Sequence, residues 1–368
     1  MSKIRVLVVD DSLFMRRMIS DLLTRDPELE VVGTAQDGQE GLEQARQLKP
    51  DVITLDVEMP VMDGITMLER LMAEQPTPVV MISSLTQVGA ETTFRCLERG
   101  AVDFVPKPSG AVSLDLYKVS SQIIEKVKAA ARVPRHRLVP QHRTAHQEGR
   151  SRPVYLPDDG RGKPAHLPKT GYGDAPLVVI GASTGGPRAL STLISQLPHE
   201  LVVPMLIIQH MPEGFTRSFA ERLNQLAHMN VREAQEGDRL QPGVAYLAPG
   251  GYHLHLQPNG RLHLSQEPPL HGVRPAVDIT LLSVAEHYSG KVVVAILTGM
   301  GSDGAMGVRM LHAKGARILA EDESSCVVFG MPRAAIQTGC VHRVVPIEQM
   351  AAALYEEVLQ LCKTSQVA

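Results

Sequence analysis

Short apolar runs alternate with amphipathic segments through the first third of the chain. Five runs are brief, rich in β-branched residues and bounded by turn residues, which is typical of strands; they read IRVLVVD, EVVGTA, VITLD, PVVMIS and DFVPK. Between the first two, apolar residues recur every three or four positions over residues 14–23, which predicts one buried helix face. The alternation predicts an α/β domain over residues 1–125, with a doubly wound, five-stranded parallel sheet.

The pattern dissolves over residues 126–175. Six prolines between positions 134 and 168 would interrupt any helix or central strand. Arg, Lys and His outnumber the acidic residues here. This composition predicts a basic, extended linker, and docking to an acidic partner is the alternative.

A second alternation runs over residues 176–364. Its strand-like runs are LVVIG, VVPMLIIQ, VAYLAP, KVVVAILTG and ARILAE, with helical stretches between several of them. They predict a second doubly wound, mostly parallel α/β domain. The segment LHLQPNGRLHL reads as a β-hairpin with a tight turn at Asn259 and Gly260.

Three histidines in this hairpin raise the question of a metal site. His253 and His255 have an HxH spacing, which is a weak signal when it stands alone. If residue 258 pairs with residue 261, His263 lies opposite Leu256, on the face away from the other two. We therefore expect no metal at the hairpin.

Composition narrows the choice of partners and compartment. The 37 Lys and Arg residues against 40 Asp and Glu give a net charge of −3, so no single-sign field favours nucleic acid or an anionic membrane. The four cysteines are far apart and form no CxxC pair, which suits a reducing compartment. The start carries two aspartates where a signal peptide would stay apolar, and no later apolar run approaches a membrane span. We expect a cytoplasmic protein.

Carboxylates gather at the expected strand ends of the first domain. Asp10 and Asp11 follow the first strand and Asp56 ends the third, so a parallel sheet brings all three to the edge where open α/β folds bind ligands. Such a cluster suits Mg²⁺. Ser83 and Lys107 end the next two strands and offer a hydroxyl and an ammonium to phosphoryl oxygens. The set predicts that Asp56 accepts a phosphoryl group; the alternative is that the aspartates only cap helices.

The motifs VLVVDDS, LDVEMPVMDG, VVMISS and DFVPKP resemble the receiver domain of two-component response regulators. The resemblance implies that Asp56 is phosphorylated and that the other two aspartates help to hold Mg²⁺. It also implies a conformational switch at Ser83 and Phe104. Lys107 would contact the phosphoryl group, with a cis peptide bond between Lys107 and Pro108. A histidine kinase would supply the phosphoryl group.

A glycine-rich turn follows the first strand of the second domain. In GASTGGP, Ser183 lies between that strand and an amphipathic segment, where flexible glycines and helix-start amides suit a nucleophile and its oxyanion. A phosphate-binding loop is the alternative, although the sequence fits neither GxGxxG nor GxxxxGK[ST]. His210, in IIQHMP after the next strand, is the candidate base, because both strand ends reach the same sheet edge.

A third residue should orient the histidine. Asp303, in LTGMGSDG after a later strand, is the candidate, and the alternative is that it only caps the following helix. Asp278 lacks a glycine-rich loop and is expected to act purely as a cap. The order Ser183, His210, Asp303 differs from that of α/β-hydrolases, so that fold is not implied.

GASTGGP, QHMP and TGMGSDG resemble the catalytic domain of the chemotaxis protein-glutamate methylesterases, and the receiver, linker and esterase order matches that family. The resemblance implies demethylation of chemoreceptor glutamate methyl esters and deamidation of certain glutamines. Ser183 would attack the γ-carbonyl, His210 would act as general base and then acid, and Asp303 would orient it. Main-chain amides near Thr184 or Met300 are candidates for the oxyanion hole, and hydrolysis would need no cofactor.

The two-domain order also implies regulation. An unphosphorylated receiver docked over the Ser183 turn would block the substrate, and phosphorylation would favour a form that binds there less well. A phosphorylation-controlled binding regulator without catalysis is one rival, although no helix-turn-helix or RNA-binding aromatic motif follows the linker. The same hydrolase acting on a different signalling protein is the other.

Overall fold

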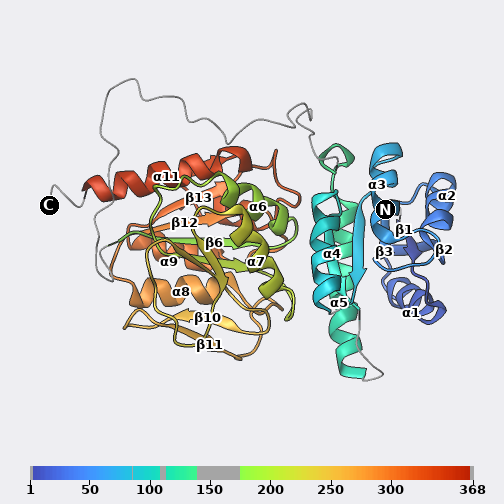
Figure 1. Cartoon of the computed structure of the whole chain (residues 1–368), viewed down its shortest axis with the longest axis horizontal. Coiled ribbons are helices and arrows are strands. Elements are labelled where there is room, and N and C mark those ends of the chain that lie inside the picture. Colours follow the sequence, from blue (N-terminus) through green and yellow to red (C-terminus); the bar gives the residue numbers. More distant parts are fainter. Residues whose placement is uncertain (1–2, 85, 108–112, 139–174, 365–368) are drawn as a thin grey trace.

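Five parallel strands form the first sheet, in the order β2-β1-β3-β4-β5. A computed structural model describes the chain at residues 3–84, 86–107, 113–138 and 175–364. The strands of this domain are β1 (Ile4–Val9), β2 (Leu29–Ala35), β3 (Val52–Asp56), β4 (Val79–Ser83) and β5 (Asp103–Pro106). Its helices are α1 (Leu13–Thr24), α2 (Gly38–Leu48), α3 (Gly64–Glu74), α4 (Gln87–Glu98) and α5 (Ser113–Ala131). The doubly wound parallel sheet predicted from the sequence is confirmed (Figure 1).

Helix α5 corrects the expected domain boundary at residue 125. The helix is continuous to Ala131, and Ile123, Val127 and Ala130 are fully buried at helical spacing. The apolar face therefore continues past residue 125, and the first domain ends after α5. A short 3₁₀ helix, η1 (Arg135–Arg137), follows it. Most of the expected linker, residues 139–174, lies outside the described residues.

The second domain is built on a seven-stranded parallel sheet of order β14-β13-β12-β6-β7-β9-β8. Its strands are β6 (Leu177–Ala182), β7 (Met205–Gln209), β8 (Asn230–Glu233), β9 (Val244–Leu247), β12 (Val292–Ile296), β13 (Arg317–Glu321) and β14 (Arg343–Val345). Its helices are α6 (Gly186–Gln196), α7 (Thr216–Leu226), α8 (Val277–His287), α9 (Ala305–Ala313), α10 (Met331–Gln337) and α11 (Ile347–Thr364). The parallel α/β prediction is confirmed. The edge strands β8 and β14 were not predicted, because three or four residues carry too little pattern.

The hairpin forms as predicted, but its register is shifted by one residue. β10 (His253–Leu256) pairs with β11 (Leu262–Ser265) so that His255 lies opposite His263. Gly260 adopts φ 75°, and Gln257 accepts the Gly260 amide while its own amide donates to Arg261. The connection is thus a longer loop than the two-residue turn we expected. The expectation that His263 faces away from His255 was wrong.

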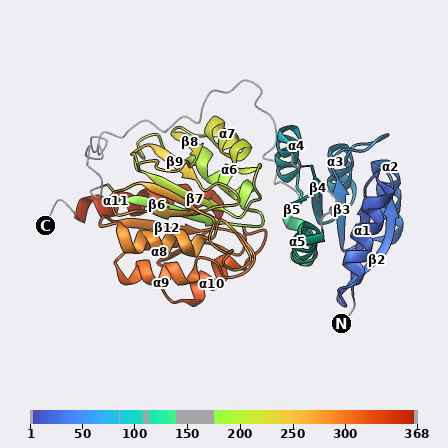
Figure 2. The ribbon, with the colours of Figure 1, turned by 90° about the horizontal axis from the view of Figure 1, so that it is seen from below.

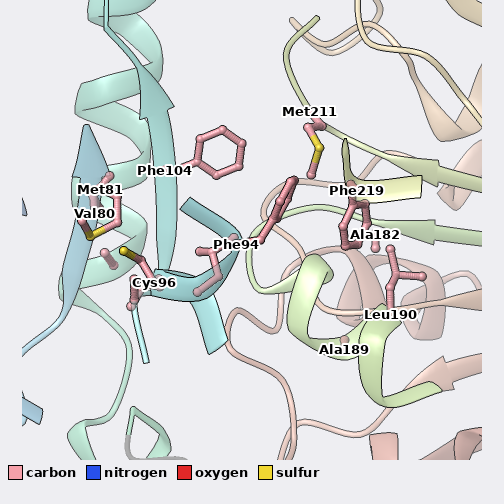
Figure 3. Packing of buried hydrophobic residues seen from close by; sticks show 14 of the residues in the cluster. Val80, Met81, Phe94, Cys96, Phe104, Ala182, Ala189, Leu190, Met211 and Phe219 are labelled. Atoms are coloured by element: carbon pink, nitrogen blue, oxygen red, sulfur yellow. The ribbon is translucent and has the colours of Figure 1, made fainter. Parts of the chain in front are cut away.

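The two domains pack against each other through α4 of the first and α6 and α7 of the second (Figures 1 and 2). Four of the six phenylalanines in the chain meet here. Phe94 stacks on Phe219 (Figure 3), with the ring centroids 5.1 Å apart. The ring centroids of Phe104 and Phe215 are 4.5 Å apart. All four rings are buried. Such aromatic pairs stabilise a contact by about 0.5–1.5 kcal/mol each beyond the effect of their buried area. The interface between the domains therefore has an aromatic core.

Candidate active site

The acidic site of the first domain lies at the carboxyl edge of its sheet. Oxygens of Asp10, Asp11 and Asp56 lie within 4.8 Å of one another. Lys107 Nζ is 2.6 Å from Asp56 Oδ2 and 3.5 Å from Asp10 Oδ2. Burial raises the pKa of Asp56 to about 6; the hydrogen bond from Lys107 opposes this rise, and the charge of Asp10 adds to it. The three aspartates and Lys107, which were expected to meet because each follows or ends a parallel strand, therefore lie together in the structure.

These residues fit the Mg²⁺ that a receiver domain implies. Asp10 Oδ2 is buried and accepts no hydrogen bond among the described residues. The Lys107 ammonium, 3.5 Å away, compensates this buried carboxylate oxygen only in part, and an all-oxygen donor set is what Mg²⁺ prefers. Asp10, Asp11 and Asp56 would hold the ion, which when bound would neutralise charge on the phosphoryl oxygens.

The two expected switch residues lie on the neighbouring strands β4 and β5, and both are buried. Ser83 is fully buried; its hydroxyl accepts a 2.7 Å hydrogen bond from Thr93 and lies 3.2 Å from the carbonyl of Gly89. Phe104 points into the interface between the domains (Figure 3). Pro108, and with it the expected cis bond after Lys107, lies outside the described residues.

Ser183 is held by its backbone in the turn between β6 and α6. Its amide donates to Thr298 O (3.0 Å), and its carbonyl accepts from the Gly186 amide (2.7 Å) and from Gln209 Nε2 (2.9 Å). Gly185 caps α6 with φ 79°, a conformation that side chains other than glycine rarely adopt. The turn fixes the position of a half-buried serine hydroxyl at the sheet edge.

His210 and Asp303 are in direct contact. Ala182 and Gln209 are register partners on β6 and β7, so Ser183 and His210 are the next residues on adjacent strands. His210 Nε2 lies 2.7 Å from Asp303 Oδ2. Because the carboxylate is the acceptor, Nε2 carries the proton and Nδ1 keeps its lone pair for a hydroxyl. No hydrogen bond joins the Ser183 hydroxyl to this ring within the described part of the chain.

The start of α8 holds the Asp303 carboxylate. The amides of Val277 and Asp278 donate to its two oxygens at 2.7 and 2.8 Å. Burial acts to raise the pKa of Asp303, but the hydrogen bond and charge of His210, together with these amides, outweigh it and lower the pKa. Asp303 therefore stays ionised and occupies the anion-binding end of a helix. It does not cap the following helix, since Gly304 is the N-cap of α9.

Asp278 corrects another expectation. It lies inside the first turn of α8, after the N-cap Ala276, and so does not cap its own helix. Its Oδ1 instead accepts the amide of Gly307 in α9 (2.8 Å). The amide of Ala276, the residue just before α8, donates to Nδ1 of the buried His253 (3.2 Å). Thus His253, weighed only as a metal ligand, supports the helix that holds Asp303.

The candidate oxyanion donors also border the turn. A Cβ placed on Gly299 would lie 2.8 Å from Ser183 Cβ, so the loop leading to Met300 passes directly beside the serine. The main-chain amides of Thr184 and Met300 have no hydrogen-bond partner among the described residues. The Thr184 side chain is occupied elsewhere: its hydroxyl donates to Asp103 Oδ2 of the first domain (2.6 Å).

Known proteins match both halves of the chain. Residues 178–354 match the family model CheB methylesterase, and residues 6–116 match the response regulator receiver domain. The protein-glutamate methylesterase/protein-glutamine glutaminase of Symbiobacterium thermophilum is 49% identical over 354 residues, which cover 95% of this chain and 96% of that protein. The chain belongs to this family. A relative of the same name from Bacillus subtilis is 46% identical and covers 95% and 97% of the two chains.

The family predicted from the motifs is therefore confirmed. The sequence analysis missed two polar residues whose side chains hold the backbone of the turn that carries Ser183. Gln209 Nε2 holds the Ser183 carbonyl, and Thr298 Oγ1 donates to the Thr184 carbonyl (2.9 Å). Both lie inside the quoted motifs. Each is a polar residue at the end of an apolar run, and because buried polar groups need hydrogen-bond partners, this position could have identified them. His271, which approaches Asp278 and Asp303, was also missed.

Proposed function

We propose that the chain hydrolyses glutamate methyl esters on chemoreceptors, and deamidates particular receptor glutamines, through an acyl-enzyme on Ser183. His210 removes the hydroxyl proton as Ser183 attacks the γ-carbonyl. The same imidazole then protonates the departing methanol or ammonia, and activates the water that releases glutamate. The observation that carries this proposal is the 2.7 Å bond between His210 and Asp303 at the strand end beside Ser183.

The carboxylate and the free amides complete the chemistry. Ionised Asp303 favours the protonated ring of His210 that forms during attack. The amides of Thr184 and Met300 would stabilise the oxyanion, and one such donor typically contributes about 3–4 kcal/mol to the transition state. All of these groups belong to the protein, so the proposed hydrolysis needs no cofactor.

The receiver domain would gate this site. Asp103 holds the hydroxyl of Thr184, next to Ser183, and Phe104 packs on Phe215, five residues after His210. In the proposed inactive form these contacts keep the receiver over the serine turn. Phosphorylation of Asp56 by a histidine kinase, with Mg²⁺, would favour a receiver form that docks less well, since only a difference in affinity can shift such an equilibrium.

The cysteines support a cytoplasmic setting for this proposal. Cys96, Cys326, Cys340 and Cys362 are all free thiols, as expected in a reducing compartment. Among the described residues, no helix combines the length and apolar character needed to cross a bilayer.

The decisive experiment is methanol release from methylated chemoreceptor membranes, with and without a small phosphodonor and Mg²⁺. Ser183→Ala should abolish release, whereas Ser191→Ala in α6, whose hydroxyl donates to the Pro187 carbonyl of its own helix, should not. Asp56→Asn should keep the unstimulated rate and lose the stimulation. No release from any receptor, with a demonstrably phosphorylated receiver, would contradict the proposal and favour another signalling substrate or a binding regulator.

A further inference from the structure

A second histidine–carboxylate pair lies beside the first. His271 Nε2 is 3.1 Å from Asp278 Oδ2 and 4.0 Å from Asp303 Oδ1. The Asp278 side chain is 1% exposed, whereas that of His271 is 40% exposed. The proposed steps of hydrolysis use neither residue, so the pair requires its own explanation.

The backbone at His271 is unusual. His271 (φ 54°) and Gly272 (φ 76°) form a two-residue turn between Leu270 and Val273, which exchange two backbone hydrogen bonds. Such turns favour Asn, Asp or Gly at the first position, because both residues need positive φ. A larger side chain held in this region, with its ring nitrogen on a buried carboxylate next to a catalytic one, points to a function.

The two carboxylates lock two helices together. Asp303, just before α9, accepts amides from the start of α8, and Asp278, in α8, accepts the Gly307 amide of α9. Asp303 thus holds the start of the helix that contains Asp278, and Asp278 holds the start of the helix that follows Asp303. A displacement of Asp278 would shift the α8 amides that fix Asp303 and, through it, His210.

The network is closed by hydrogen bonds. Both Asp303 oxygens and Asp278 Oδ1 accept amide hydrogens, and Asp278 Oδ2 has His271 as its donor. Burial raises the pKa of Asp278, the Gly307 amide lowers it, the charge of Asp303 raises it and the His271 bond lowers it again. His271 therefore favours the ionised form of a second carboxylate beside the first. With His210 on Asp303 Oδ2 as well, five donors meet the four oxygens, so the set is complete without a cation.

We propose that His271 is a positioning residue for hydrolysis, acting through Asp278 on Asp303. Its Nε2–H fixes the Asp278 carboxylate, which keeps the start of α8, and hence Asp303, in line with His210. Further titratable or charged groups near this network are His253, whose Nδ1 accepts the Ala276 amide, Arg274, which bonds carbonyls of residues 266 and 267, and Glu267, whose charge acts on His253. The inference rests on the proposed function, because it assumes that Asp303 orients His210.

The test compares His271→Gly with His271→Gln in the full chain, activated by phosphodonor and Mg²⁺ on methylated chemoreceptor membranes. Glycine removes the imidazole and suits φ 54°, so the fold is preserved; glutamine keeps an N–H donor that reaches Asp278. We expect His271→Gly to lower kcat about tenfold with KM unchanged, as loss of a donor to a buried carboxylate implies. His271→Gln should restore kcat to within about twofold.

The pH profile separates positioning from mere structure. In His271→Gly the acid limb of kcat/KM should move to lower pH, because a misplaced Asp303 no longer favours the protonated His210 ring. The matched control is His263→Gln on β11, which removes an exposed imidazole at the same 3.1 Å from a carboxylate, that of Glu236. That control should leave kcat and the profile unchanged.

Three results would overturn the inference. A wild-type kcat and pH profile in His271→Gly would show that Asp303 needs no help from His271. Equal losses of kcat and of thermal stability in both variants, without rescue by glutamine, would show a structural role only. A wild type that releases no methanol would contradict the proposed function itself, and the positioning role with it.

Discussion

The carboxylate of Asp103 accepts a 2.6 Å hydrogen bond from the hydroxyl of Thr184, across the interface between the two domains. Its other oxygen accepts the Phe104 amide (2.7 Å) and Lys126 Nζ (2.8 Å). Asp103 and Thr184 are only 7% and 4% exposed. One anchored carboxylate therefore joins the expected switch residue of the receiver to the residue that follows Ser183.

Removing this bond should raise the unstimulated activity. A hydrogen bond to a charged group contributes about 1.5–3 kcal/mol, which corresponds to about tenfold or more in a docking equilibrium. Asp103→Ala should therefore speed methanol release by about tenfold without phosphodonor and leave the fully stimulated rate little changed. Glu98→Gln is the matched control, because its interdomain ion pair with Arg222 is partly exposed and should contribute little. An unchanged basal rate in Asp103→Ala would contradict this role.

Asp303→Asn should nearly abolish hydrolysis while the chain stays folded. The NH₂ group of the new side chain cannot accept a hydrogen bond, yet it must face a donor, either His210 or an α8 amide. The imidazole is then no longer held with its proton on the nitrogen that faces residue 303. We expect kcat to fall about 10⁴-fold, by analogy with triads in which this carboxylate is replaced by its amide. Asp322→Asn, where the carboxylate only bonds Ser324 within its own loop, should retain activity. Measured kcat above about a tenth of wild type in Asp303→Asn would exclude the assigned role.

Glu321, at the end of β13, should make stability depend on pH. The side chain is fully buried and its oxygens accept from the Thr298 amide (2.8 Å) and Ser325 Oγ (2.9 Å). Burial raises the pKa of Glu321 to about 7, although these hydrogen bonds oppose the rise. Between its ordinary value and about 7 the unfolded chain is ionised while the folded chain stays protonated. The free energy of unfolding should therefore fall by about 3 kcal/mol as pH rises through this window and be independent of this group above it.

Glu321→Gln tests this directly. The amide can accept from Thr298 and donate to Ser325, but it cannot ionise. Denaturant unfolding at several values between about pH 5 and pH 8 should show a smaller decline for the variant than for wild type. If the free energy of unfolding changed with pH equally in the two proteins, Glu321 would not be the source of the pH dependence.

Chelation of divalent cations should separate the two sites. With EDTA, stimulation by a small phosphodonor should disappear, because the oxygens of Asp10, Asp11 and Asp56 would lack Mg²⁺. The unstimulated methanol release should be unchanged, since the proposed groups at Ser183 are all protein atoms. A fall in the unstimulated rate on adding EDTA, reversed by Mg²⁺, would show that hydrolysis itself needs a metal.

The sequence predicted both sheets and the contact of His210 with Asp303, because one rule governs them: in a parallel sheet, residues after different strands meet at one edge. It failed at the hairpin, where the register depends on whether the loop has two residues or more. Gly260 at φ 75° closes the longer loop, and the dipeptide Asn259-Gly260 fits both lengths. His255 and His263 therefore changed from opposite faces to direct neighbours.

Asp278 and Phe104 show a second limit. The cap preference of Asp278 was read from its own helix, but the amide that it accepts comes from Gly307 in another helix. Likewise, the buried surroundings of Phe104 include Phe215, more than a hundred residues away along the chain. Local pattern identifies a residue that needs a partner, whereas tertiary packing decides which partner it receives.

The packing of Phe104 on Phe215 also affects phosphorylation of the receiver domain. If phosphorylation weakens domain docking by some factor, thermodynamic reciprocity requires docking to weaken the phosphorylated state of the receiver by the same factor. The catalytic domain is then an antagonist of its own activating signal. A receiver freed from the contact with Phe215 should retain its phosphoryl group at lower phosphodonor concentration than the receiver of the intact chain.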